Sequence, residues 1–401
     1  MQQFQACNKQ IRLRGSWIDF VQNVFNMQNK FNYKFFYILA AVFLIAWLVL
    51  TLRQANEWGG WLLMLLFLSL AIAFRGNTTL KGLSYTLMVI AVVSLAMYYP
   101  QYFKTVGNFK LSGLIIPLLQ IIMFGMGTEL SLRDFANVVR MPKGIIVGVV
   151  FHYVIMPLVG FGVANIFNFP NEIAAGIILV GCCPSGLASN VMSYLARANL
   201  ALSVSVTTIS TMLAPFLTPL LMRLLGGSFV QIDFWGMVWD ITKIVIIPVA
   251  GGLAFHYLIH GRFKWLDKAM PLLSMAGIAV ILTIITASGR DNLLKVGALL
   301  IVATFIHNLA GYFFGYWASR LLRFHERDCR TIALEVGMQN AGLASGLALA
   351  MGKLATAGLA PAIFGPVMNV TGSALASWWH NHLPKDPSSP KGEEVVEIVA
   401  T

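Results

Sequence analysis

The chain has 401 residues, of which 58% are hydrophobic and only 11% are charged, and its formal net charge is +12. Soluble domains usually carry about 25% charged residues, so a soluble fold of this composition would expose large apolar patches to water. The composition therefore argues against a soluble enzyme and favours an all-α polytopic membrane protein with the lipid bilayer as its surroundings. In such a protein the basic excess reflects loop topology, and we do not expect nucleic acid as a partner.

The first elements expected along the chain are apolar helices that follow a polar N-terminal segment, residues 1–33. A membrane-spanning helix needs about 20 mostly apolar residues. Such runs predict twelve spans, at residues 34–52, 58–74, 83–99, 111–127, 144–166, 172–195, 200–225, 236–258, 268–288, 293–321, 329–351 and 358–380. The tail, residues 384–401, is rich in Pro, Ser and Glu, and we expect it to be disordered.

Lys and Arg residues gather in alternate loops. If the N-terminus is cytoplasmic, about 20 of them fall on the cytoplasmic side and about 7 on the other side. This bias predicts a multi-pass protein of the inner (plasma) membrane with both termini in the cytoplasm.

A short motif occurs twice, in opposite predicted orientations. Pro184–Ser189 reads PSGLAS and Asn340–Ser345 reads NAGLAS, at a spacing of 156 residues. A histidine inside a predicted span, His152 or His307, lies 32 or 33 residues before the start of each copy. Matched segments of opposite orientation are typical of inverted-repeat transporters.

Glu335 is a carboxylate inside an apolar predicted span, and the closest basic residue in that stretch is Arg330. A charge at the bilayer centre costs about 2.5–3.5 kcal/mol on insertion scales, so such residues are rarely structural filler. We interpret Glu335 as a cation ligand or a proton carrier. The alternative is a protonated side chain that bonds to a neighbouring helix.

Helix-breaking residues lie beside this carboxylate and beside the first copy of the motif. Gly337–Asn340 and Cys183–Gly186 both interrupt helical propensity, which leaves backbone carbonyl groups without intrahelical partners. Irregular backbone at membrane depth is tolerated where it lines a cavity or is buried in protein. Carbonyl, amide and carboxylate oxygens together favour a hard cation such as Na⁺.

Hydroxyl and amide side chains follow the first break. Ser189 and Asn190 come directly after it, and Ser203 and Thr207 share one face of the next helix because they are four residues apart. Each hydroxyl alone could simply bond to the preceding helical turn. Together with Glu335 they could complete a shell of oxygens.

Two of these stretches resemble the signatures of the bile acid:sodium symporter family. They are Gly181–Thr207, which reads GCCPSGLASNVMSYLARANLALSVSVT, and Glu335–Asn340, which reads EVGMQN. The likeness covers about residues 83–380 and is of the prokaryotic type. It implies ten helices in a panel and a core subdomain, with two broken helices that cross near the membrane midplane. Residues 79–383 would form this symporter core, and the pair of spans in 34–78 would lie outside it.

The resemblance also implies a function and its residues. It implies sodium-coupled symport of an organic anion by alternating access, with no catalytic residues and no organic cofactor. By position, the first sodium site would use Ser189, Asn190, Ser203, Thr207 and Glu335. The second would use Glu335, Gln339, the backbone carbonyls of Val336 and Met338, and His152, which stands where the family usually has Gln. One or two sodium ions are therefore both compatible with the sequence.

The substrate-binding residues implied by position are Ser185, Gly186, Leu187, Asn340, Met368 and Asn369. Leu187 replaces a Thr and Met368 replaces a His of the family pattern, so the cavity becomes more apolar. The half-helices that begin near Leu187 and Ala341 present amino-terminal ends, whose partial positive charge favours an anion.

Two other functions were weighed. The first is a proton-coupled or facilitative carrier of the same fold, in which Glu335 and His152 would relay protons. The second is an intramembrane enzyme acting on lipid or peptide, which would need a nucleophile–base pair. The sequence does not choose between a steroid-like acid and a small carboxylate, and it indicates neither the oligomeric state nor the role of the N-terminal pair.

Overall fold

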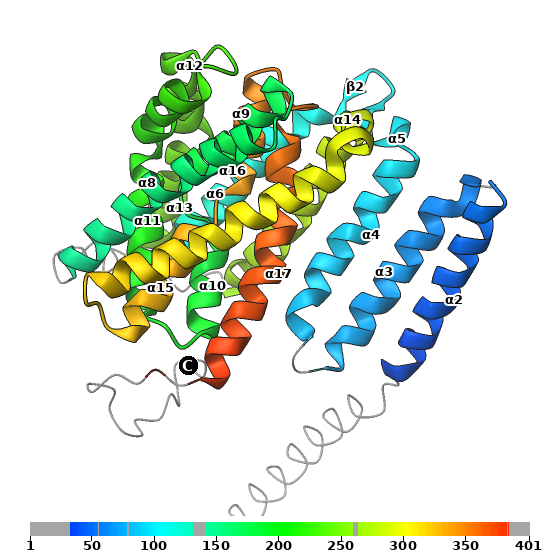
Figure 1. Cartoon of the computed structure of the whole chain (residues 1–401), viewed down its shortest axis with the longest axis horizontal. Helices are drawn as coiled ribbons and strands as arrows, with labels where there is room; N and C mark the ends of the chain where they lie inside the picture. The colour runs from blue at the N-terminus through cyan, green and yellow to red at the C-terminus, as the bar shows by residue number, and fades with distance from the viewer. Residues whose placement is uncertain are drawn as a thin grey trace, which may run out of the picture. The chain divides into compact units, whose positions relative to one another are not determined.

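The computed structural model describes residues 33–54, 56–77, 80–130, 141–259, 264–382 and 384 (Figure 1). Within these ranges the protein is helical apart from one short antiparallel hairpin, β1 (Thr105–Val106) with β2 (Phe109–Lys110). The prediction of an all-α polytopic membrane fold is confirmed. The predicted N-terminal segment 1–33 and tail 384–401 lie almost wholly outside the described residues.

The chain forms two compact units, Met1–Ala91 and Val92–Thr401, and the boundary falls inside helix α4 (Ser84–Tyr98). The first unit contains α2 (Tyr33–Leu52) and α3 (Gly59–Arg75), which pack against each other. In α2 only Ala40 is buried, and apolar side chains such as Ile38 and Leu52 are exposed, which suits a helix facing lipid. These two helices match the predicted pair 34–78, and the placement of that pair outside a symporter core stays a prediction.

The second unit holds the remaining helices. They are α5 (Gln101–Lys104), α6 (Ile115–Glu129), α8 (Pro142–Ile166), α9 (Asn171–Cys182), α10 (Ala188–Leu195), α11 (Leu200–Leu221), α12 (Phe234–Ile241), α13 (Ile247–Ile259), α14 (Lys264–Leu321), α15 (Glu326–Gly337), α16 (Ala341–Ala350) and α17 (Leu359–Asn381). Two π-helical segments extend them, η4 (Met222–Gly226) after α11 and η5 (Thr242–Ile246) between α12 and α13.

Seven helices in the described part of the chain are long and apolar enough to cross a membrane, judged by length and composition. The predicted spans 268–288 and 293–321 both lie within one helical element, α14, so the residues between them are helical. The residues between them include no proline, so no backbone N–H is missing there. With 58 residues, α14 is much longer than the roughly 20 residues that one crossing needs. The predicted total of twelve spans and the inverted repeat both stay predictions.

The two predicted breaks are present, and they pair with each other. The helix of the first motif stops at Cys182 and resumes at Ala188, and that of the second stops at Gly337 and resumes at Ala341. The main-chain amide of Gly186 donates to the Met338 carbonyl at 3.1 Å, and the main-chain amide of Asn340 donates to the Pro184 carbonyl at 2.8 Å. Backbone groups that leave their own helices are thus satisfied by the other break.

Gly186 allows this close approach. A Cβ atom at this position would lie 2.6 Å from the Gln339 carbonyl oxygen, a distance that real Cβ contacts do not reach. Only glycine, which has no side chain, therefore allows the two non-helical backbone segments to come this close.

Candidate functional site

The Glu335 carboxylate lies fully buried on α15, one turn before the second break. It accepts hydrogen bonds from the hydroxyls of Ser189 at 2.6 Å, Ser203 at 2.5 Å and Thr207 at 2.8 Å. Ser189 belongs to α10 and the other two to α11, so three helices converge on one carboxylate.

Asn190 adds an amide oxygen to the same cluster. Its Oδ1 lies 2.9 Å from the Ser203 hydroxyl and 3.2 Å from the Thr207 hydroxyl. Each of these hydroxyls has one proton but faces two acceptors, the amide oxygen and the Glu335 carboxylate. A centre richer in acceptors than in donors suits a bound cation, which would be held by the oxygen lone pairs. The structure therefore brings together all five residues that the sequence assigns to the first sodium site.

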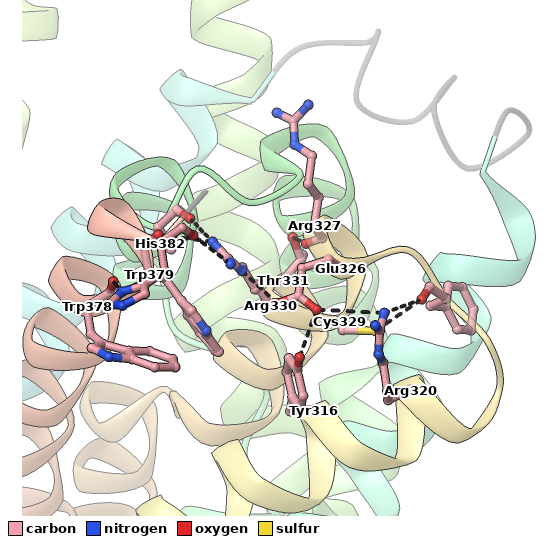
Figure 2. A network of polar contacts seen from close by, with 12 residues as sticks. Tyr316, Arg320, Glu326, Arg327, Cys329, Arg330, Thr331, Trp378, Trp379 and His382 are labelled. Carbon is pink, nitrogen blue, oxygen red and sulfur yellow. Dashed lines mark hydrogen bonds and ion pairs between the residues drawn. The ribbon is translucent and has the colours of Figure 1, made fainter. Parts of the chain in front are cut away.

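No basic side chain forms an ion pair with Glu335 within the part of the chain that the structure describes. Arg330, the nearest basic residue in that helix, is engaged elsewhere. Its Nε donates to Glu326 at 2.9 Å, and its NH2 group donates to the His382 carbonyl at 2.8 Å (Figure 2). An ionised carboxylate buried without a partner is costly, so Glu335 requires a proton or a mobile cation.

The residues predicted for a second sodium site lie close by, but several of their groups already have partners. The Val336 carbonyl accepts from Gln339 Nε2 at 2.7 Å, and the Met338 carbonyl accepts from the Gly186 amide and the Ser185 hydroxyl. Gln339 Oε1 is buried and has no hydrogen-bond partner.

His152 lies fully buried on α8 between the two broken helices. Its Nδ1 is 2.9 Å from the main-chain oxygen of Glu335, and its Nε2 is 2.8 Å from the main-chain oxygen of Cys183. The ring thus bridges α15 and the first break through both nitrogens. Because a neutral imidazole carries a single N–H, one of these nitrogens donates to its carbonyl and the other faces a carbonyl oxygen with its lone pair.

The predicted substrate residues divide between the two breaks and α17. Leu187 begins α10 without a side-chain cap, whereas Asn340 caps α16 by accepting from the Leu343 amide at 2.9 Å. Met368 is buried on α17, and Asn369 beside it is partly exposed. The start of α10 therefore has no side-chain cap, and its Ser189 and Asn190 amides bond to the main-chain carbonyls of Gly186 and Leu187.

Side chains that the sequence did not indicate satisfy the carbonyl groups at the ends of the broken helices. Asn308 on α14 donates to the Gly337 carbonyl at 2.9 Å, and Thr371 on α17 donates to Asn308. At the first break, Thr218 donates to the Cys182 carbonyl at 2.7 Å. The one signal for this role is that Asn308 directly follows the intramembrane histidine His307.

Broken helices that pair inside an apolar helical fold, beside a buried carboxylate, define the class of secondary membrane transporters. The model of the Sodium Bile acid symporter family matches residues 116–296. The Bacillus subtilis protein named uncharacterized sodium-dependent transporter YocS is 39% identical over 315 residues, which cover 78% of this chain and 96% of that protein.

Plant proteins are similar over most of the same region. The rice protein named probable sodium/metabolite cotransporter BASS1, chloroplastic, is 35% identical over 76% of this chain and 74% of its own length. The Arabidopsis thaliana protein of the same name is 35% identical over 67% of each chain. The chain belongs to the sodium bile acid symporter family. This membership confirms a multi-pass transporter and not an intramembrane enzyme.

Proposed function

We propose that the protein is a sodium-coupled symporter of an organic anion that works by alternating access. The observation that carries this proposal is the buried Glu335 carboxylate, which three hydroxyls approach and no described basic residue neutralises. A bound cation would neutralise this carboxylate and could leave again during transport. The relatives named as sodium-dependent transporters and sodium/metabolite cotransporters support Na⁺ as that cation.

The ligand chemistry favours sodium as a transported co-substrate. The Glu335 carboxylate, the Asn190 amide and the hydroxyls of the cluster are all hard oxygen donors, which suit Na⁺ and not thiophilic metals. These donors come from α10, α11 and α15, so ion binding would draw the two broken helices together with their neighbour. Binding of Na⁺ and binding of the anion would then be coupled, because the proposed anion site is formed by the same breaks.

We assign one sodium ion to the Glu335 shell and none to the second set of residues. In that set the single N–H of neutral His152 is used on a main-chain oxygen, and its other nitrogen is a poorer ligand for Na⁺ than an amide oxygen. The Val336 and Met338 carbonyls have donors of their own. Symport of one Na⁺ with a monoanion moves no net charge. A tenfold sodium gradient would then accumulate substrate about tenfold, since each factor of ten is worth about 1.4 kcal/mol.

The anion is proposed to bind where α10 begins. The dipole of this half-helix favours a carboxylate, and Asn340 and Asn369 supply polar groups from the second break and α17. Leu187 and the buried Met368 give the rest of this region an apolar lining. The substrate class is therefore an organic acid with an apolar body, either a small carboxylate or a steroid-like acid.

We place the protein in the plasma membrane of a bacterial-type cell with both termini cytoplasmic, on the basis of its loop charges and its Bacillus relative. The function is tested with purified protein in liposomes that contain a sodium-sensitive dye. A panel of labelled carboxylates is added with Na⁺ or K⁺ outside, and uptake and Na⁺ entry are followed together. We expect at least one acid to enter only with Na⁺. Entry driven by a pH gradient without Na⁺ would favour the proton-coupled carrier, and entry without either gradient would favour a facilitator.

A further inference from the structure

Two of the helices around Glu335 meet along one polar seam. On α11 and at its N-cap, Asn199, Ser203 and Thr207 follow one another at four-residue spacing, so they share one face. On α15, Thr331 and Glu335 have the same spacing. Ser203 and Thr207 contact Glu335, and one helical turn away Asn199 contacts Thr331.

The contact at the end of this seam is closely hydrogen-bonded. The main-chain amide of Asn199 donates to the Thr331 hydroxyl at 2.9 Å, and the same hydroxyl lies 3.1 Å from the main-chain carbonyl oxygen of Asn199. The Asn199 Nδ2 donates to Asp328 at 2.8 Å, while its Oδ1 caps α11 by accepting from the Leu202 amide. We call Asn199, Asp328 and Thr331 the seam lock.

Arg330 ties further helix ends to the same place. Its NH1 group donates to the Ala196 carbonyl, just after α10, at 3.3 Å and to the Trp379 carbonyl of α17 at 3.1 Å. Figure 2 shows this side chain between Glu326 on one side and Trp379 and His382 on the other. The first turns of α15 therefore bond to the C-terminal end of α10 and to the N-terminal end of α11. All three helices carry proposed sodium ligands.

The opposite end of the broken helices carries a related but different contact. Glu172 on α9 forms an ion pair with Lys353 and accepts from the Thr356 hydroxyl at 2.6 Å, in the segment between α16 and α17. Glu172 and Asp328 are 156 residues apart, the spacing of the two sequence motifs. The proposed sodium ligands lie on α10, α11 and α15, and neither partner in this contact belongs to those helices. It therefore offers a matched control for the seam lock.

We propose that Asn199, Asp328 and Thr331 are positioning residues that set the spacing between the Glu335 carboxylate and the Ser203 and Thr207 hydroxyls. This inference rests on the proposed sodium site. Asn199 and Thr331 lie one helical turn, about 5.4 Å, from these oxygens and Asp328 lies about two turns away, so the lock fixes the register of α15 against α11. The number and spacing of coordinating oxygens determine which ion a site prefers. The seam lock thus tunes both the affinity for Na⁺ and the preference for Na⁺ over Li⁺.

The test compares Thr331→Val, Thr331→Ser and the control Thr356→Val in the full-length purified protein. Na⁺ and Li⁺ are titrated separately, with tryptophan fluorescence as the readout, and the thermal midpoint of each variant is recorded. We expect Thr331→Val to raise the half-saturating Na⁺ concentration about three- to tenfold, as the loss of one or two buried hydrogen bonds would. Its ratio of Na⁺ to Li⁺ affinity should also move toward one.

Thr331→Ser keeps the hydroxyl and should stay within about twofold of the natural protein, and Thr356→Val should leave both quantities unchanged. If Thr331→Val does not fold, Asp328→Ala replaces it, with Asp328→Asn as the variant that keeps the acceptor oxygen. An unchanged ion ratio in the lock variants, or an equal shift in Thr356→Val, would overturn the inference and leave the sodium site standing. Absence of Na⁺-specific binding in the natural protein would overturn both.

Discussion

The two breaks use the same backbone device but carry different chemistry. At each break a helix stops, crosses its counterpart and resumes after three to five residues. Before the second break stands Glu335, whereas 156 residues earlier the corresponding position is Leu179. After the first break α10 begins without a side-chain cap, whereas α16 is capped by Asn340. In the proposed assignment the carboxylate before the second break serves the cation, and the dipole of the uncapped half-helix after the first break serves the anion.

This difference shows how one symmetric-looking backbone can bind two unlike partners. The crossing holds the two breaks next to each other, because the main-chain amides of Gly186 and Asn340 bond across it. Side chains then decide which ion each half receives. A cation at Glu335 and an anion at the start of α10 would stabilise each other through the shared crossing.

Removal of the charge at Glu335 should have the largest effect on this arrangement. In Glu335→Gln the side-chain shape is kept, but the acceptor loses its charge, and hydrogen bonds to charged groups are worth about 1.5–3 kcal/mol. We expect Na⁺-driven uptake to fall about a hundredfold at moderate Na⁺. Uptake into proteoliposomes measures this, with Glu172→Gln as the control carboxylate at the other end of the broken helices. Full Na⁺ dependence in Glu335→Gln would contradict the assignment of the cation to the second break.

Separation of the two breaks should impair both binding sites at once. In Gly186→Ala the new Cβ would press on the Gln339 carbonyl oxygen, so the backbone must move. We expect lower thermal stability and weaker binding of both Na⁺ and substrate. Gly162→Ala, at a site where a Cβ meets nothing within 4 Å, serves as the control. Normal transport in Gly186→Ala would show that the close crossing is not required.

Loss of one hydroxyl should weaken the cation site alone. Thr207→Val keeps the side-chain shape but removes the oxygen that lies 2.8 Å from Glu335. We expect the half-saturating Na⁺ concentration to rise about tenfold, while the substrate concentration for half-maximal uptake stays the same at saturating Na⁺. Thr208→Val, whose hydroxyl bonds within its own helix to the Val204 carbonyl, is the neighbouring control. A change confined to substrate affinity would place Thr207 in the anion site.

The smallest expected change concerns the number of ions. His152→Gln frees an amide oxygen beside the carbonyls that the imidazole now bridges, and amide oxygen is a better ligand for Na⁺ than nitrogen. We expect the dependence of uptake on Na⁺ to become steeper and transport of a monoanion to become sensitive to membrane potential. Uptake at imposed potassium diffusion potentials measures this. Potential-dependent uptake in the natural protein would contradict the assignment of one ion.

Much of the fold could be predicted because it rests on local signals. Apolar length predicts the spans, and the Pro and Gly residues of Cys183–Gly186 and Gly337–Asn340 mark both breaks. The functional importance of Glu335 could also be predicted from a local signal, because it is a lone carboxylate in an apolar predicted span, where a charge is costly. The helical conformation of residues 289–292 in α14 could not be predicted, because the polar residues there are also typical of a loop.

The contacts between distant segments could not be predicted. His152 and Cys183 lie 31 residues apart and His152 and Glu335 lie 183 apart, so no local pattern indicates that one ring bridges both. The same holds for Asn199 with Thr331 and for Asn308 with Gly337. Register between packed helices depends on the whole fold, and the seam that aligns Ser203 with Glu335 becomes visible only in three dimensions.

The most direct test of the central assignment is a calorimetric titration of Na⁺, with K⁺ as the reference ion, into purified natural protein and Glu335→Ala. We expect saturable heat for Na⁺ but not for K⁺ in the natural protein, and none for either ion in Glu335→Ala. Na⁺ binding that persists unchanged in Glu335→Ala, or its absence from the natural protein, would contradict a sodium site built on this carboxylate.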